Sequence, residues 1–148
     1  MPAKFTHRER GASFVEFVLI VPFFLMLVFG IISFGVMLSF RQTMSQAATE
    51  GARAAAVAPS NLTYSQRRDR AISAINESFQ GQIGGTLTCG AILTCTIPNV
   101  PVTCGDSNQC ISITLSYPYR DHPRVEVSQF FGFTLPQTVS YSSSARIN

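Results

Sequence analysis

Residues 17–40, FVLIVPFFLMLVFGIISFGVMLSF, decide the fold, because these 24 residues contain no charged side chain. As an α-helix they would extend roughly 36 Å, enough to cross a hydrocarbon core of ~30 Å with some tilt. The flank before them carries Lys4, Arg8 and Arg10 against Glu9, and a basic flank stays on the cytoplasmic side of a membrane. We therefore expect one membrane span at about 17–40, with the rest of the chain beyond it.

The helical pattern continues past the span as far as Pro59, which ends it. This predicts one long helix over residues 12–58. Beyond the span, small residues recur every three or four positions on one helix face: Met44, Ala48, Gly51, Ala52 and Ala55. Such a face either allows a helix of another subunit to approach closely or packs against this protein's own second helix. Both interpretations stay open at this point.

A second helix is predicted over residues 64–80, with an apolar stripe of Ile72, Ile75 and Phe79. Its first turns hold a basic cluster, RRDR at 67–70. We interpret this cluster as a solvated helix face in preference to a phosphate-binding site.

Beyond Gly85 the apolar period changes from helical to two, which indicates β-strands. The expected strands form a small antiparallel sheet and lie at 86–97, 101–104, 110–119, 124–131 and 138–147. The predicted fold class is thus α+β: a long N-terminal transmembrane helix, a second helix, then a small sheet domain with disulfides. The expected domains are a basic leader (1–11), the long helix (12–58) and an α+β domain (59–148).

Four cysteines lie in the sheet region: Cys89, Cys95, Cys104 and Cys110. An even number in an exported segment is typical of disulfides formed in an oxidising compartment, and the spacing C-x5-C-x8-C-x5-C does not match the CxxC pairs of zinc sites. Two pairings stay open. The nested one, 89–110 with 95–104, would bridge one hairpin because both pairs have the same sum of residue numbers, and it is slightly favoured. The other, 89–95 with 104–110, is favoured by the GDSN turn at 105–108.

The remaining composition argues against several function classes. The net charge of +3 is modest and owes much to the leader, so no nucleic-acid partner is expected. His7 and His122 are isolated and the acidic residues are scattered, which indicates neither a catalytic triad nor a carboxylate pair. We expect no enzyme activity, metal, cofactor or small-molecule substrate.

Glu16 is a carboxylate at the very start of the apolar run, five residues after Gly11. Cutting the Gly11–Ala12 bond would remove the basic leader and leave an α-amino group at Ala12, which is largely cationic at neutral pH. Glu16 would then have a partner of opposite charge on its own chain or on a neighbouring subunit. Taken alone, Glu16 could equally serve as an N-terminal acid that complements the helix dipole.

These residues carry a resemblance to a known family. A basic leader ending in Gly11, followed by Ala12, Glu16, Phe17 and an apolar helix, resembles a class III prepilin signal of the type IV pilin kind. The longer run is similar to TadE-like pseudopilins of bacterial tight-adherence (Tad/Flp) pilus systems. The matching segments are VEF at 15–17, an early proline at 22, GI at 30–31 with FG at 34–35, and AATEGAR at 47–53.

This resemblance implies a minor pilin-like component, cut between Gly11 and Ala12 by a prepilin peptidase, with Glu16 and Phe17 guiding processing and subunit registry. Implied partners are other pilin-like proteins and the Tad assembly platform at the bacterial inner membrane. The implied topology has a cytoplasmic N-terminus and a periplasmic C-terminal domain, with a place in the pilus itself left open. The alternatives are an uncleaved single-pass anchor whose periplasmic domain binds a partner and, less favoured, an exported enzyme.

Overall fold

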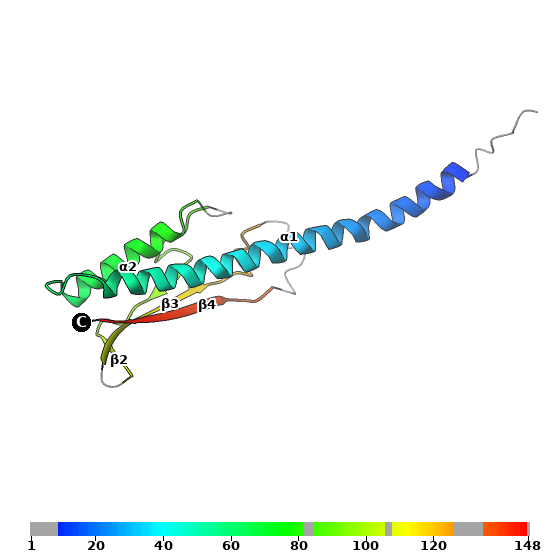
Figure 1. Ribbon diagram of the computed structural model, residues 1–148. Helices are drawn as coiled ribbons and strands as arrows, with labels where there is room; N and C mark the ends of the chain where they lie inside the picture. Colours follow the sequence, from blue (N-terminus) through cyan, green and yellow to red (C-terminus); the bar gives the residue numbers. More distant parts are fainter. Residues whose placement is uncertain (1–8, 82–84, 106–107, 126–134, 148) are drawn as a thin grey trace, which may run out of the picture.

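The computed structural model describes residues 9–81, 85–105, 108–125 and 135–147. It contains a very long helix, α1 (Glu9–Ala56), and a shorter helix, α2 (Tyr64–Ser78), which lies beside the end of α1 (Figure 1). An antiparallel sheet lies on the opposite side of α1 from α2, and the N-terminal half of α1 projects away from this body (Figure 1). The α+β fold class is confirmed. Most of the predicted leader, 1–8, falls outside the described residues.

The turn between the helices is specified locally. Thr63 is the N-cap of α2: its hydroxyl accepts from the Gln66 backbone N–H, and the Gln66 side chain accepts from the Thr63 N–H. This reciprocal capping box satisfies two backbone donors that the first turn leaves unpaired. α2 therefore starts where the sequence predicts and turns back along α1.

The end of α1 is stabilised by a buried cation. Arg67 of α2 is only 4% exposed, and its guanidinium donates to the carbonyls of Ala55 and Pro59, both at 3.1 Å. The last carbonyls of a helix have no intrahelical partner, so the bond to Ala55 satisfies a group that would otherwise be orphaned. The bond to Pro59, whose carbonyl also accepts from the Leu62 N–H, fixes the turn between the helices. The interpretation of RRDR as a solvated face is therefore wrong for Arg67, although Arg70 is exposed.

The small-residue face of α1 is used within the chain. Met44, Ala48, Ala52 and Ala55 are all buried in the core formed by α1, α2 and the sheet. Gly51 lies at the closest approach: a Cβ placed there would be 2.7 Å from Ile75 Cγ1 and 3.2 Å from Ile113 Cδ1. Packing on the protein's own second helix is therefore confirmed for these residues, and the approach of another subunit along other turns of α1 stays a prediction.

The sheet is built around β3 (Asn108–Tyr117). β4 (Val139–Arg146) pairs with it along one edge, from Cys110↔Arg146 to Tyr117↔Val139. On the other edge β2 (Val102–Cys104) pairs with the first residues of β3, and β1 (Thr94–Thr96) pairs with the last. Alternate β3 side chains, among them Ile111, Ile113 and Leu115, are fully buried, so this face of the sheet packs against the helices.

The predicted strands are longer than those observed. Only Thr94–Thr96 of the segment 86–97 is extended; before it, a tight turn with Gly90 at φ +91° brings Cys89 back to Leu93. A positive φ is accessible to glycine without steric cost, which explains this turn inside an otherwise strand-like pattern. Most of the strand expected at 124–131 lies outside the described residues, and Arg124 and Val125 are in a bend.

The disulfides join Cys89 to Cys95 and Cys104 to Cys110, with Cα–Cα distances of 5.4 and 5.9 Å. The slightly favoured nested pairing is wrong. It required β1 and β2 to pair with one another, whereas both pair with β3, so Cys95 lies opposite Leu115 and Cys104 opposite Asn108. Each bridge therefore closes a short local loop.

Candidate functional site: the exposed half of the long helix

The predicted processing residues lie in the first turns of α1. The helix begins at Glu9, so the Gly11–Ala12 bond is already helical, whereas the sequence predicted a helix start at residue 12. Nothing lies within 4 Å of a Cβ built at Gly11, which leaves this position open to a larger side chain as far as the fold is concerned. Ala12 and Glu16 are four residues apart and hence one above the other on the same helix face.

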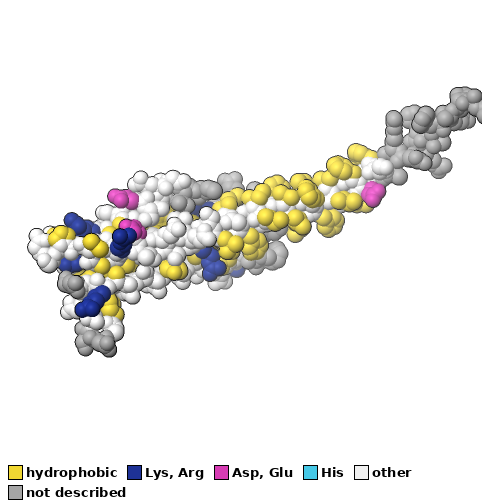
Figure 2. Space-filling view, in the orientation of Figure 1, with side chains coloured by type: hydrophobic (Ala, Val, Ile, Leu, Met, Phe, Trp, Pro, Cys, Tyr) yellow, Lys and Arg dark blue, Asp and Glu magenta, His cyan; other side chains and the backbone are white. Residues whose placement is uncertain are grey.

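Glu16 is an acidic residue at the N-terminal end of the apolar surface of α1. Phe14, Val15, Phe17 and Val18 around it are all exposed. Figure 2 shows a magenta acidic side chain next to the N-terminal end of the helix, followed by a continuous hydrophobic surface. The structure thus brings Gly11, Ala12, Glu16 and Phe17 together at one end of the helix, far along it from the folded body.

The apolar surface that follows is almost unpartnered. Among the described residues, α1 is the one helix long and apolar enough to cross a membrane, and only 6% of its most apolar window is buried. A core helix of a water-soluble domain would bury this face. Its exposure is what a lipid-facing helix requires.

The folded body begins to cover α1 at Ser33, which is 2% exposed. Met37 and Phe40 are buried on the same side, whereas Phe34 and Leu38 on the other side remain exposed. The end of the predicted span, 33–40, therefore has one side on protein and one side open.

An aromatic cluster covers α1 at this level. The Phe40 ring lies 4.8 Å from the Tyr117 ring and 5.6 Å from the Tyr119 ring, and the Arg124 guanidinium lies 5.6 Å from its centroid. Arg124 also donates to the Gly85 carbonyl, which ties the loop after α2 to this cluster. Sequence reasoning missed Arg124, because a buried cation over a ring depends on contacts between distant segments and leaves no local pattern.

The Tyr119 phenol titrates above its usual range. Burial raises its pKa first, and the neighbouring Tyr117 raises it further, while the Arg124 charge and a hydrogen bond from the Arg124 backbone oppose the shift. Burial disfavours the charged phenolate, so the surroundings of Tyr119 stabilise its neutral form.

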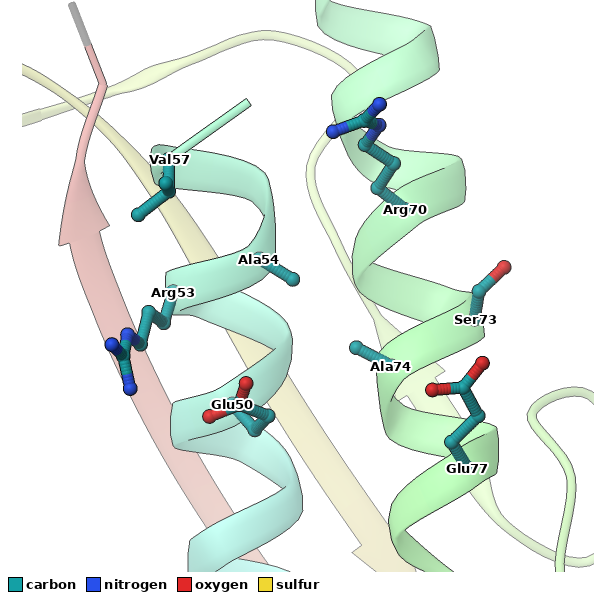
Figure 3. A pocket seen from close by; sticks show the side chains of 8 residues that line it. All are labelled: Glu50, Arg53, Ala54, Val57, Arg70, Ser73, Ala74 and Glu77. Atoms are coloured by element: carbon teal, nitrogen blue, oxygen red, sulfur yellow. The ribbon is translucent and has the colours of Figure 1, made fainter. Parts of the chain in front are cut away.

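A shallow groove runs between α1 and α2. Figure 3 shows Ala54 and Ala74 between the helices, with Glu50 on α1 and Arg70 and Glu77 on α2 around them. Both signs of charge line it, so it presents no field that would select an anion or a cation. Within the described ranges, no three His, Cys, Asp or Glu side chains are placed to hold a metal ion.

The AATEGAR segment at 47–53 divides between packing and surface. Ala47, Ala48, Gly51 and Ala52 face the core, while Glu50 and Arg53 are exposed beside the groove. Its small residues therefore serve the approach of α1 to its own domain.

Comparison with known proteins finds a family match for the N-terminal part of the chain. The family described as "TadE-like protein" matches residues 11–53, which cover the exposed half of α1 and continue through AATEGAR. No curated protein matches the chain, and no solved structure does.

Proposed function

We propose, from the premise that this chain is TadE-like over residues 11–53, that it is a minor pilin-like component supporting the biogenesis of a bacterial Tad (Flp-type) pilus and adherence. The match by itself indicates a Tad pilus-associated component of a structural kind. The observation that carries the proposal is that the matched segment is one continuous helix, exposed and apolar first and packed on a folded domain afterwards. Such a helix can be held in a membrane while presenting a domain outside it.

In this proposal a prepilin peptidase cuts the Gly11–Ala12 bond and removes the basic leader. The new α-amino group at Ala12 then stands one helical turn before Glu16, within reach of a charge-assisted contact. Glu16 pairs with this group on its own chain or on the adjacent subunit, and Phe17 packs beside it. The open space around Gly11 supports assigning its requirement to the peptidase and not to the fold.

The proposed location is the bacterial inner membrane, with a cytoplasmic N-terminus, a span at about 17–40 and a periplasmic domain over 59–148. The two disulfides support an oxidising compartment for that domain. The proposed partners are other pilin-like subunits and the proteins of the Tad assembly platform.

An uncleaved anchor with a partner-binding domain is the second candidate. Its support is the sheet face turned away from α1, which carries short hydroxyl side chains on two neighbouring strands: Ser112, Thr114 and Ser116 on β3, and Ser140, Ser142 and Ser144 on β4. The charged Arg146 lies at the end of this face, opposite Cys110. A polar face with its charge confined to one end can be desolvated at modest cost when a partner covers the hydroxyl rows.

The deciding experiment is the N-terminal sequence and intact mass of the protein extracted from membranes with and without an active prepilin peptidase. We expect an Ala12 start with the peptidase and a Met1 or Pro2 start without it. Gly11→Leu should retain the leader in both strains, while Gly30→Leu, at another helical glycine with open space around it, should be processed normally. An intact N-terminus in the peptidase-positive strain would refute processing and favour the anchor.

Glu16 is tested separately from the cut. Glu16→Gln keeps the size of the side chain and removes its charge, so membrane insertion should persist while processing or piliation decreases. Unchanged processing, subunit crosslinking and piliation in this variant would show that the pairing role is wrong.

A further inference from the structure

The free length of α1 is short for a bilayer. From Phe17 to Ser33, where the folded body begins to cover the helix, sixteen residue steps correspond to about 24 Å. A hydrocarbon core is ~30 Å thick, and tilting the helix shortens its projection further. The exposed segment alone therefore does not span the core.

The helix cannot easily slide to correct this mismatch. Placing Ser33 at the boundary of the core would put the opposite boundary near Ser13, which draws Glu16 about 4–5 Å into the hydrocarbon. A carboxylate within the core is expensive. With Phe17 at the first boundary, the second lies near Met37, beside exposed Phe34 and Leu38.

We infer that the end of the folded domain nearest the span rests in the phospholipid headgroup layer instead of standing clear of the bilayer. We call this end the membrane-proximal surface and define it as α1 residues 33–41 with the turn at 117–124. The inference rests on the proposed single-pass insertion, and its occupant is the lipid of the leaflet on the domain's side.

The composition of the membrane-proximal surface supports this placement. Tyr117 and Tyr119 are buried against Phe40 and hold the turn at 117–124 beside this level of α1, while Phe34 and Leu38 stay exposed there. Arg41 is exposed immediately beyond Phe40 and can reach lipid phosphates. Arg120 is exposed on the turn and adds a second positive charge there, although its guanidinium also donates to the Leu135 carbonyl. Figure 2 shows basic side chains where the hydrophobic helix surface meets the folded body.

The test uses single tryptophans, because the chain contains none. The reporters are Phe24→Trp in the middle of the exposed span, Leu38→Trp on the open side of α1, and His122→Trp on the exposed turn, in full-length protein reconstituted in phosphatidylcholine–phosphatidylglycerol vesicles. The backbone carbonyl of His122, not its side chain, accepts the Tyr117 hydroxyl, so this substitution keeps that bond. Val57→Trp, at a 76% exposed position near the distal end of α1, is the matched control.

Phospholipids brominated at different depths quench tryptophans at the same depth. We expect loss of Phe24→Trp emission with deep bromines, loss of Leu38→Trp and His122→Trp emission with bromines near the headgroups, and no loss for Val57→Trp. If Phe24→Trp is quenched while Leu38→Trp and His122→Trp behave like Val57→Trp, the domain stands clear of the bilayer and the inference is overturned, although insertion stands. Failure to quench Phe24→Trp would instead overturn the insertion itself. Asp121→Trp, also exposed on this turn, replaces His122→Trp if that variant does not fold.

Discussion

Gly51→Ala should destabilise the folded domain, even though alanine is the better helix former. A Cβ at this position would be 2.7 Å from Ile75 Cγ1 and 3.0 Å from Ile75 Cδ1, with Ile113 Cδ1 at 3.2 Å. Overpacking of this kind costs ~1–3 kcal/mol, while replacing a helical glycine by alanine returns ~1 kcal/mol. The expected net loss is about 1 kcal/mol, which corresponds to a Tm decrease of about 5 °C.

The measurement is thermal unfolding of the detergent-solubilised protein followed by circular dichroism. Gly35→Ala is the matched control, because nothing lies within 4 Å of its Cβ, and it should leave the Tm unchanged or raise it. The background Ile75→Ala removes the two closest atoms and leaves only Ile113 Cδ1 at 3.2 Å, so Gly51→Ala should cost less there. An equal cost of Gly51→Ala in both backgrounds, or a higher Tm of the single variant, would refute the reasoning.

Three further predictions concern the folded domain. Arg67→Met removes the donor of the Ala55 carbonyl and the second donor of the Pro59 carbonyl, which keeps the Leu62 N–H. It should cost about 2–3 kcal/mol in urea unfolding, whereas Arg70→Met, at an exposed position, should change little. Burial raises the pKa of Tyr119 in the folded protein above its usual value of 10.0. The stability that depends on the neutral phenol is therefore fully present below pH 10 and is lost as the pH rises through the folded pKa. Tyr119→Phe has no phenol to ionise, so its free energy of unfolding should decrease less than that of the wild type on alkaline titration. Non-reducing peptide mapping should yield peptides linked 89–95 and 104–110, and removing one bridge by paired Cys→Ser changes should cost about 2 kcal/mol, since each loop is short.

The candidate site was open to sequence reasoning because its residues are adjacent in the chain. Gly11, Ala12 and Glu16 fall within two helical turns, and the uncharged run after them requires a long apolar helix whatever the rest of the chain does. The structure adds their common position at the exposed end of α1. Processing and pairing at these residues stay predictions.

What the sequence by itself determined is the order and kind of the elements. The uncharged run produces the first helix, Pro59 limits it, and the change of apolar period from helical to two separates helices from strands. These are local properties, set within a few turns of helix or a few residues of strand, and they do not depend on how the elements are packed against one another.

Only the tertiary structure decided which groups meet. The disulfide pairing follows from both short strands pairing with β3, and the burial of Arg67 follows from α2 turning back on the end of α1. The length of α1 left uncovered follows from the folded body covering it from Ser33 onward. Each of these depends on the packing of segments that are distant in sequence. Such a contact changes the environment of a residue but leaves no mark on the sequence of its neighbours, so it cannot be predicted from the local pattern of apolar and polar residues.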